Sequence, residues 1–459
     1  MTSSTVASEP APITPSGNSG LRNTAIALDV LDRVLAGYGS RDFALRLWDG
    51  TTVPSDPGRE CKFTLVLNKP GMLRRTLFPP NELALGEAYL DGDFEIEGDI
   101  VEAMRLSDAF EKLSMGPISL LSITRQVMAL PKGDSLSDNN NDREQGLRRL
   151  RLSGPEHSRE RDRKAVTYHY DVGNEFFKLF LDQRMIYSCG YFPTGHEDLD
   201  TAQEAKLEHI CRKLRLERGE RLLDIGCGWG GLIMYAAERY GVEALGITLS
   251  QPQAELANQM IAEAGLSDCC KALVLDYRDL AGQGLFDKIV SVGMVEHVGK
   301  AKLPAYFEAA WQSLKPGGLF LNHGITAAAK DPSCSNPLDR YIFHKGAFIR
   351  KYVFPDGELV PVADTLWPAE RAGFEVRDVE SLREHYALTL RHWVKRLESN
   401  RDEAIRQVGE RTYRVWRLYM AGCSHAFTTA RLNVHQTILS KPDCQGRSQM
   451  PMSREYIYA

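Results

Sequence analysis

Apolar and polar stretches alternate regularly along the second half of the chain. Short apolar runs with the length and composition of buried strands occur at 221–227, 243–249, 271–277, 287–293, 319–325 and 374–380. Between them lie amphipathic stretches, of which 250–265 carries the clearest helix signals. Ser250 and Gln253 have the spacing of a capping box, Pro252 lies in the first turn, and Gly265 is suited to end the helix. This alternation predicts an α/β fold with a parallel, doubly wound sheet.

The first part of the chain has a different pattern. Residues 21–125 contain shorter apolar patches, such as "CKFTLVLN", punctuated by glycine, aspartate and proline, and predict a smaller domain. Residues 1–20 are rich in Ser, Thr, Pro and Gly and predict a disordered tail. The polar, arginine-rich stretch 126–165 is interpreted as a solvated linker, with contact to anionic lipid headgroups as the alternative. The main domain then spans 166–459.

The composition narrows the class of protein. The chain has 459 residues, enough for two or three domains, and a formal net charge of -5, which does not favour a nucleic-acid partner. Its nine cysteines are odd in number and include no CxxC spacing, which argues against a disulfide framework and a structural zinc site and favours a reducing cytosol. No secretory signal and no membrane-spanning apolar run are visible. Any contact with a membrane is therefore expected to be peripheral.

A glycine-rich loop, "DIGCGWGG", follows the first predicted strand of the main domain. Its glycines Gly226, Gly228 and Gly230 let the backbone approach a ligand closely, as in dinucleotide enzymes and in methyltransferases. A dinucleotide enzyme would end its second strand with an acid, but this strand ends "GITLS". A nicotinamide cofactor is therefore disfavoured against S-adenosylmethionine (SAM). Asp224, just before the loop, is a candidate acceptor for an amino group, directly or through water.

Two further segments are candidates for the nucleoside part of the cofactor. Gln253 is a candidate for the ribose, because the second-strand acid that most SAM enzymes use is missing; its other role is the capping box, and it can fill both. "VLDYRDL" supplies Asp276, Tyr277 and Arg278 at the end of the third strand, where such sheets bind ligands. An acid beside a flat ring suits the edge and face of an adenine, and a simple surface turn is the alternative.

The region from about Tyr168 to the C-terminus resembles the cyclopropane-fatty-acyl-phospholipid synthases, which include the mycolic acid cyclopropane synthases. The matching segments are "YHYDVGNEFFKLFLDQRMIYSCGYF", "LLDIGCGWGG", "GITLSQPQ", "LDYRDL", "DKIVSVGMVEHVG", "LNHGI", "KYVFPDGELV" and "HYALTLRHW". The segment "LGEAYLDGDFEIEGDI" resembles the N-terminal domain of the bacterial phospholipid-acting members. The resemblance implies a seven-stranded, doubly wound, Rossmann-like SAM-methyltransferase domain with a smaller, lipid-associated N-terminal α+β domain.

The resemblance also implies an activity and a set of site residues. A methyl group passes from SAM to a cis double bond of a lipid acyl chain, and the resulting carbocation loses a proton to a bound bicarbonate ion and closes to a cyclopropane. The bicarbonate ligands carry over to Cys189, Glu296, His323, Ile325 (through its backbone) and Tyr386. The SAM contacts carry over to Tyr187, Ser188, Gly226, Gly228, Leu249, Gln253, Tyr277 and Arg278. The cofactor candidates are completed by Asp224, Gly230, Thr248 and Asp276, and no metal is expected.

The residue types suit this chemistry. An alkene is a poor nucleophile, and aromatic faces such as those of Tyr187 and Tyr191 can stabilise a sulfonium or a carbocation. A small anion as base avoids the alkylation that a protein carboxylate beside the cation would risk. Tyr386, His323 and a backbone N–H can donate to the anion, while Glu296 either accepts from its hydroxyl or orients His323.

The lone Cys189 stands among aromatic residues, where a cysteine is usually core. A nucleophile and a metal ligand are the alternative roles. With the family resemblance we interpret it as a small, weak donor that helps to seat the anion.

Rival functions remain open. The same carbocation can undergo a hydride shift and give a methylene-branched chain. More distant rivals are a small-molecule N- or O-methyltransferase and a non-catalytic lipid- or SAM-binding protein. The resemblance further implies a homodimer that works at the cytoplasmic face of the membrane on unsaturated phospholipid chains.

Overall fold

The computed structural model describes residues 18–78, 81–111, 117–132, 154–155, 157–170, 172–329, 346–448 and 450–458. The chain divides into two compact units, Met1–Asn140 with Asn336–Ala347 and Asn141–Ser335 with Phe348–Ala459. Most of the predicted tail 1–20, and the middle of the predicted linker 126–165, lie outside the described residues. The helices α6 (Pro117–Ala129) and α8 (Arg159–Tyr170) each extend into that linker stretch.

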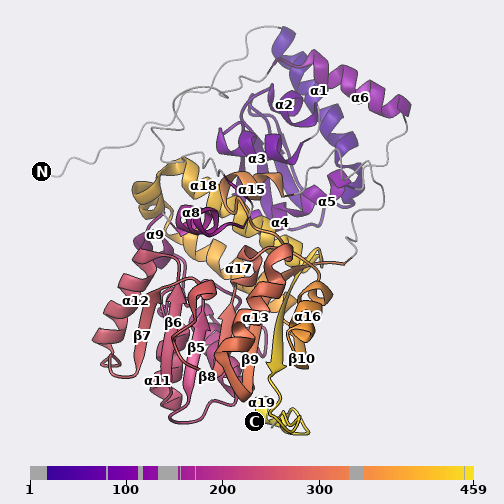
Figure 1. Ribbon diagram of the computed structural model, residues 1–459. Helices are drawn as coiled ribbons and strands as arrows, with labels where there is room; N and C mark the ends of the chain where they lie inside the picture. The colour runs from indigo at the N-terminus through magenta and orange to yellow at the C-terminus, as the bar shows by residue number, and fades with distance from the viewer. Residues whose placement is uncertain are drawn as a thin grey trace, which may run out of the picture. The chain divides into compact units, whose positions relative to one another are not determined.

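The first unit is a small α+β structure, as the sequence predicts (Figure 1). Its sheet has the order β2-β1-β3-β4, in which β1 and β3 are parallel and the other pairs are antiparallel. The strands are β1 (Phe43–Arg46), β2 (Thr52–Val53), β3 (Phe63–Leu67) and β4 (Phe94–Gly98). Its other helices are α1 (Asn18–Val34), η1 (Ala36–Tyr38), α2 (Met72–Leu77), α3 (Glu82–Leu90), α4 (Ile100–Ala103) and α5 (Arg105–Glu111).

The second unit contains a seven-stranded sheet of order β10-β11-β9-β8-β5-β6-β7 (Figure 1). The strands are β5 (Arg221–Ile225), β6 (Glu243–Thr248), β7 (Cys270–Val274), β8 (Phe286–Val292), β9 (Leu314–Ala327), β10 (Glu375–Ser381) and β11 (Leu432–Ser440). The apolar runs anticipated six of them. The seventh, β11, lies antiparallel between β9 and β10, so the sheet is mostly rather than wholly parallel.

Helices cover both faces of this sheet. Buried side chains of α10 (Leu199–Leu214), α11 (Gly231–Tyr240) and α12 (Gln251–Glu263) pack on one face. Those of α13 (Leu303–Ser313) and α16 (Val362–Arg371) pack on the other. The remaining elements are α9 (Asn174–Lys178), η2 (Tyr277–Asp279), η3 (Val295–His297), η4 (Lys300–Lys302), α15 (Ala347–Tyr352), α17 (Arg383–Ser399), α18 (Arg401–Thr428) and α19 (Glu455–Tyr458). The doubly wound prediction is thus confirmed.

No helix in the described parts of the chain combines the length and the apolar character that crossing a bilayer requires.

Candidate active site

A cavity of about 150 Å³ lies where β5, β6, β7 and β8 end. The carboxyl ends of parallel strands are where open α/β sheets bind ligands, so this is the expected place for the cofactor. Most of the predicted cofactor residues line it: Tyr187, Ser188, Asp224, Gly226, Gly228, Thr248, Leu249, Gln253, Tyr277 and Arg278. The other two predicted cofactor residues, Gly230 and Asp276, do not line the cavity.

The glycine-rich loop turns the chain from β5 into α11. Gly226, Gly228 and Gly230 have φ values of 88°, 55° and 83°, in the left-handed region that L side chains rarely adopt. A Cβ at Gly226 would lie 3.0 Å from the Cβ of Met294. Gly230 instead forms the N-cap of α11 and faces Ala257, so it shapes the turn without reaching the cavity.

Gln253 is held beside the end of β6. Ser250 caps α12, as predicted, by accepting a hydrogen bond from the Gln253 backbone N–H at 3.4 Å. The reciprocal half of a capping box is not formed, because the Ser250 N–H donates to Thr248 Oγ1 at 3.2 Å. Thr248 in turn donates to Gln253 Oε1 at 2.7 Å. The Gln253 amide is thus oriented by Thr248 and lines the cavity, where its N–H groups can meet the cofactor.

Asp276 differs from its expected role at an adenine edge. Its carboxylate accepts from Arg278 Nε at 2.8 Å and from Arg278 Nη2 at 2.6 Å. Arg278, and not Asp276, therefore lines the cavity. The Tyr277 ring packs edge-on against Tyr306 with centroids 5.5 Å apart. Tyr277 therefore offers a fixed flat surface, and Asp276 acts by holding Arg278.

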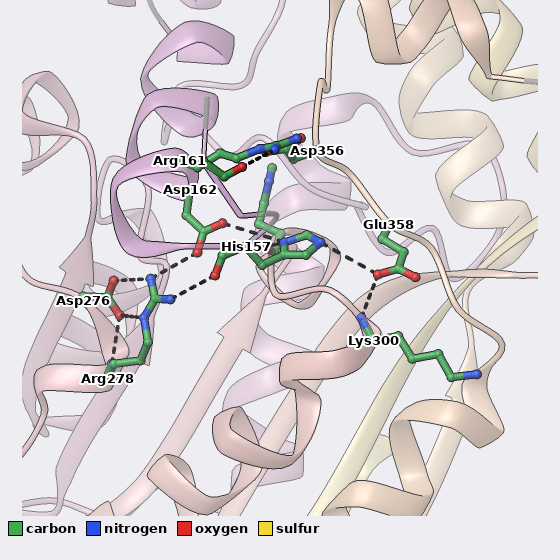
Figure 2. A network of polar contacts seen from close by, with 10 residues as sticks. His157, Arg161, Asp162, Asp276, Arg278, Lys300, Asp356 and Glu358 are labelled. Carbon is green, nitrogen blue, oxygen red and sulfur yellow. Dashed lines mark hydrogen bonds and ion pairs between the residues drawn. The ribbon is translucent and has the colours of Figure 1, made fainter. Parts of the chain in front are cut away.

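A segment that we call the strap forms ion pairs along one edge of the cavity, and the sequence analysis did not predict it. The strap comprises residues 157–162, the start of α8 and the residues before it (Figure 2). Asp162 lines the cavity and pairs with Arg278 at 3.1 Å. Arg161 makes two hydrogen bonds to Asp356, at 2.6 and 2.7 Å. Burial raises the pKa of Asp162, against the lowering effect of Arg278.

His157 lies at the centre of the strap (Figure 2). Its ring nitrogens are 3.7 Å from Asp162 and 3.8 Å from Glu358. Nδ1 also lies 3.3 Å from the backbone oxygen of His297, whose side chain lines the cavity. The strap therefore connects α8 both to Arg278 in the cavity wall and to the segment after Phe354.

The loop that carries Tyr187 and Ser188 is fixed by one carboxylate. Asp182 accepts from the Arg184 N–H at 2.9 Å and from the Ile186 N–H at 2.8 Å. These bonds support a left-handed backbone at Met185, with φ 57°, an uncommon conformation for such a residue. The result is that Tyr187 and Ser188 both face the cavity.

Glu296 is a buried carboxyl group with one free oxygen. Oε1 accepts from the Ile325 backbone N–H at 2.7 Å, whereas Oε2 is buried and has no partner within the described residues. Burial raises the pKa of Glu296 to about 7, against the lowering effect of the bond from Ile325. The Ile325 N–H that was expected to hold an anion is thus used by Glu296. When it is protonated, the carboxyl group of Glu296 can donate to an anion in place of the Ile325 N–H.

Cys189 and Glu296 each lie close enough to the buried Tyr386 to influence its ionisation. The charges of Tyr187, Cys189 and Glu296 each act to raise the pKa of Tyr386, after the larger effect of burial. Burial likewise raises the pKa of the Cys189 thiol far above neutral pH. Cys189 therefore stays protonated, which excludes a thiolate nucleophile. Its Sγ lies 3.2 Å from the Gly190 oxygen and 3.7 Å from the Leu382 oxygen, so the structure directs the predicted donor at the backbone.

His323 is held apart from Glu296. Its Nδ1 lies 3.2 Å from Gln436 Nε2, a residue of β11, and burial lowers the pKa of His323 to about 3. The ring is therefore neutral. With Nδ1 accepting from Gln436, Nε2 carries the proton and can donate. Within the described residues no hydrogen bond joins Glu296 and His323, so the alternative in which Glu296 orients His323 is not supported.

Aromatic rings surround the cofactor loop. Tyr187 stacks on Trp393 with centroids 5.0 Å apart and an interplanar angle of 26°. Tyr170 meets Trp229 edge-on at 5.7 Å, and both line the cavity. Tyr191, expected near the sulfonium, instead stacks between His209 and His385 at 4.2 and 4.9 Å and is not part of the wall.

The cavity wall also contains polar and aromatic residues that the sequence analysis did not name as site residues, among them Tyr170, Lys206, Trp229 and Asp162. Tyr170 and Trp229 stand inside segments that carry the family resemblance, which was the available signal. Lys206 and Asp162 are charged residues on helices, where a surface position is the usual expectation.

Comparison with known proteins identifies the family. The model of the mycolic acid cyclopropane synthetase family matches residues 157–437. The chain belongs to this family. A second model, of a domain of unknown function, matches residues 30–112 in the first unit.

Relatives in the family share most of the chain. A probable fatty acid methyltransferase of Pseudomonas putida is 42% identical over 414 residues, which cover 90% of this chain and 95% of that protein. The cyclopropane-fatty-acyl-phospholipid synthase of Escherichia coli K12 is 34% identical over 375 residues, 82% of this chain and 87% of that protein. The structure of mycolic acid cyclopropane synthase CmaA1 with SAH and CTAB aligns with a TM-score of 0.57 and 34% identity, covering 60% of this chain and 97% of that one.

The family membership makes this protein a SAM-dependent methyltransferase that acts on lipid acyl chains. The cavity fits SAM. Its glycine loop permits close approach, and Asp224 presents to it a buried oxygen, Oδ1, that has no partner within the described residues. SAM, when bound there, supplies the electrophilic methyl group.

Proposed function

We propose that this enzyme transfers a methylene group from SAM to the cis double bond of unsaturated acyl chains in membrane phospholipids, with cyclopropane chains as product. One observation carries the proposal: a buried, partly unpaired Glu296 near Tyr386, in an aromatic region beside the cofactor cavity. The printed name of the Escherichia coli relative supports the same substrate class.

The chain's own residues favour a cationic reaction. The double bond attacks the methyl group, which leaves a positive charge on the acyl chain. The Tyr187 ring, fixed by Trp393, can stabilise a positive charge by roughly 0.5–2 kcal/mol through cation–π attraction. The surrounding rings also exclude water, which would otherwise capture the cation. Loss of one proton and ring closure then give the net transfer of a methylene group.

We infer that bicarbonate is the base, as in the family. When bound, it accepts the proton that the methylated chain loses. The residues fit a small oxyanion: Glu296 Oε2 is unpaired, and no hydrogen bond of the Tyr386 hydroxyl is seen among the described residues. Because the pKa of Glu296 is about 7, its carboxyl group is partly protonated near neutral pH and can donate to an anion. His323 Nε2 is a further donor. The Cys189 thiol donates to the backbone oxygen of Gly190 at 3.2 Å, so it would reach the anion only by exchanging that bond.

We further propose that the protein is a homodimer that works at the cytoplasmic face of the membrane, without a nucleic-acid partner. The first unit is proposed to contact lipid. Exposed apolar side chains on it support this, among them Leu21, Phe78, Leu121 and Met128. Sedimentation of the purified protein with phospholipid vesicles tests the membrane contact, and analytical ultracentrifugation tests the dimer.

The names of some relatives suggest a second product, a methylene-branched chain. Relatives of the chain include a probable fatty acid methyltransferase and, at 36% identity over 302 residues, a tuberculostearic acid methyltransferase of Mycobacterium tuberculosis. In such a case the cation would undergo a hydride shift and lose its proton to give a methylene-branched chain. That chain has the same mass as the cyclopropane, so mass alone does not distinguish the two products.

Proton NMR of the acyl chains tests the proposal. Purified enzyme is incubated with SAM and vesicles of mono-unsaturated phospholipid, and the chains are then released. Upfield cyclopropane signals are the expected result. Olefinic methylene signals would move the protein to the second product, and unchanged chains would overturn the phospholipid substrate.

A further inference from the structure

A buried lysine in the cofactor cavity has no role so far. Lys206 lies on α10, is 2% exposed and belongs to the cavity wall. Burying a charged ammonium is costly unless an opposite charge or several acceptors compensate it. Its Nζ donates to Ser188 Oγ at 3.1 Å, and within the described residues it forms no ion pair. An ammonium group has three N–H donors, so two remain for a ligand.

An unpaired anion lies in the same wall. Asp224 is 3% exposed, and its Oδ1 has no partner within the described residues. Burial raises the pKa of Asp224 to about 7, against the attraction of Lys206. Burial also lowers the pKa of Lys206 to about 8, against the attraction of Asp182, Cys189 and Asp224. The cavity thus contains one positive and one negative group, each incompletely compensated.

We propose that Lys206 and Asp224 together bind the amino-acid end of SAM, the ammonium of Lys206 pairing with the α-carboxylate and the carboxylate of Asp224 with the α-amino group. That end of the cofactor is a zwitterion, so its two charges match the two buried groups in number and in sign. Ser188, which accepts from Lys206, would hold the ammonium in place. The assignment of Lys206 depends on the cofactor, which the family establishes, and not on the lipid substrate.

A free anion such as bicarbonate is the competing ligand for Lys206. Its positive charge also reaches His323 and Cys189, where it lowers the pKa of both groups. The cavity favours SAM, because Lys206 and Ser188 line it whereas Cys189, Glu296 and Tyr386 do not.

Calorimetry with two ligands separates these possibilities. S-adenosylhomocysteine carries the amino-acid end, and 5′-methylthioadenosine lacks it. For Lys206→Met we expect the affinity for S-adenosylhomocysteine to fall about 10- to 100-fold, the usual worth of a hydrogen bond to a charged group. The affinity for 5′-methylthioadenosine should stay within about twofold. Equal losses for both ligands, or no loss for either, would overturn the assignment.

Lys213 provides a matched control. It is a second fully buried lysine on α10, but it pairs with Glu380 and Asp378 and does not line the cavity. Lys213→Met should change stability and leave both affinities unaltered. If Lys206→Met keeps its affinity for S-adenosylhomocysteine but needs more bicarbonate for half-maximal turnover, Lys206 serves the anion instead and the proposal fails.

A measurement on the unaltered enzyme tests the proposal even if the Lys206→Met variant does not fold. Decarboxylated S-adenosylhomocysteine retains the amino group and lacks only the carboxylate. We expect it to bind at least about tenfold more weakly than S-adenosylhomocysteine. Equal affinities would exclude a paired carboxylate, whatever the lipid assay shows.

Discussion

Replacing Glu296 by glutamine tests the base region most directly. The amide has nearly the same shape, and its carbonyl oxygen can still accept from the Ile325 N–H, as Oε1 does at 2.7 Å. Glu296 does not line the cofactor cavity, so the affinity for S-adenosylhomocysteine should not change. The amide can still donate a hydrogen bond to the anion, but it cannot take up or release a proton. Turnover should therefore fall by about 100- to 1000-fold, within the range typical for loss of a proton-transfer group.

The same substitution should change how stability depends on pH. The pKa of Glu296 is raised from 4.5 to about 7, which corresponds to a penalty of about 3 kcal/mol on its charged form, at about 1.4 kcal/mol per pH unit. Between these two values the folded protein holds a proton that the unfolded chain has released. Stability is therefore lost as the pH rises from 4.5 through 7. The glutamine variant lacks this loss and should become more stable than the parent by about 3 kcal/mol toward pH 8.

Three measurements on the two proteins check the reasoning. Urea titrations at pH 4.5 and pH 8 give the difference in unfolding free energy, and Asp224, present in both proteins, cancels from it. Calorimetry gives the cofactor affinity, and the NMR assay gives turnover. Lost affinity in Glu296→Gln would place Glu296 in the cofactor site. A stability difference that does not change with pH would refute the raised pKa.

Three further outcomes are expected. Removing bicarbonate should slow the enzyme reversibly without changing cofactor affinity, and an unchanged rate in carbonate-free buffer would contradict the role of the anion. Cys189 should resist iodoacetamide at pH 8 while the exposed Cys61 and Cys444 react, because burial raises the pKa of the Cys189 thiol. Labelled Cys189 in mass spectrometry of the peptides would contradict this prediction. Asp162→Asn removes one of the two carboxylates that hold Arg278 and leaves Asp276, so it should weaken S-adenosylhomocysteine binding about fivefold. Arg159→Gln breaks only an exposed pair with Asp279 and should change the affinity less than twofold by calorimetry.

The parts of the site that follow from local chemistry could be predicted from the sequence. A glycine loop after a buried strand requires left-handed backbone, and the structure has it at Gly226 and Gly228. The start of α12 was predictable because Ser250 caps its own neighbours. Tyr277 was predicted to line the cavity because it follows the third strand of the sheet, and such sheets bind ligands at the carboxyl ends of their strands.

The rest depends on distant partners, which periodicity does not encode. The direction of β11 is set by its pairing with β9 and β10. Asp276 was expected to face the adenine, but its oxygens are taken by Arg278, two residues further on. The sequence identifies the residue types present and leaves their pairing to the tertiary structure.

The strap has a consequence for when the enzyme becomes active during its own synthesis. Asp162 and Arg278 are 116 residues apart, and Arg161 and Asp356 are 195 apart. A ribosome adding about 5–20 residues per second needs roughly 10–40 seconds to make the second interval. In the later part of that interval the glycine loop has been made, while the strap still lacks its contact with Asp356. A nascent chain should therefore reach its full affinity for the cofactor only after most of the second unit has been made.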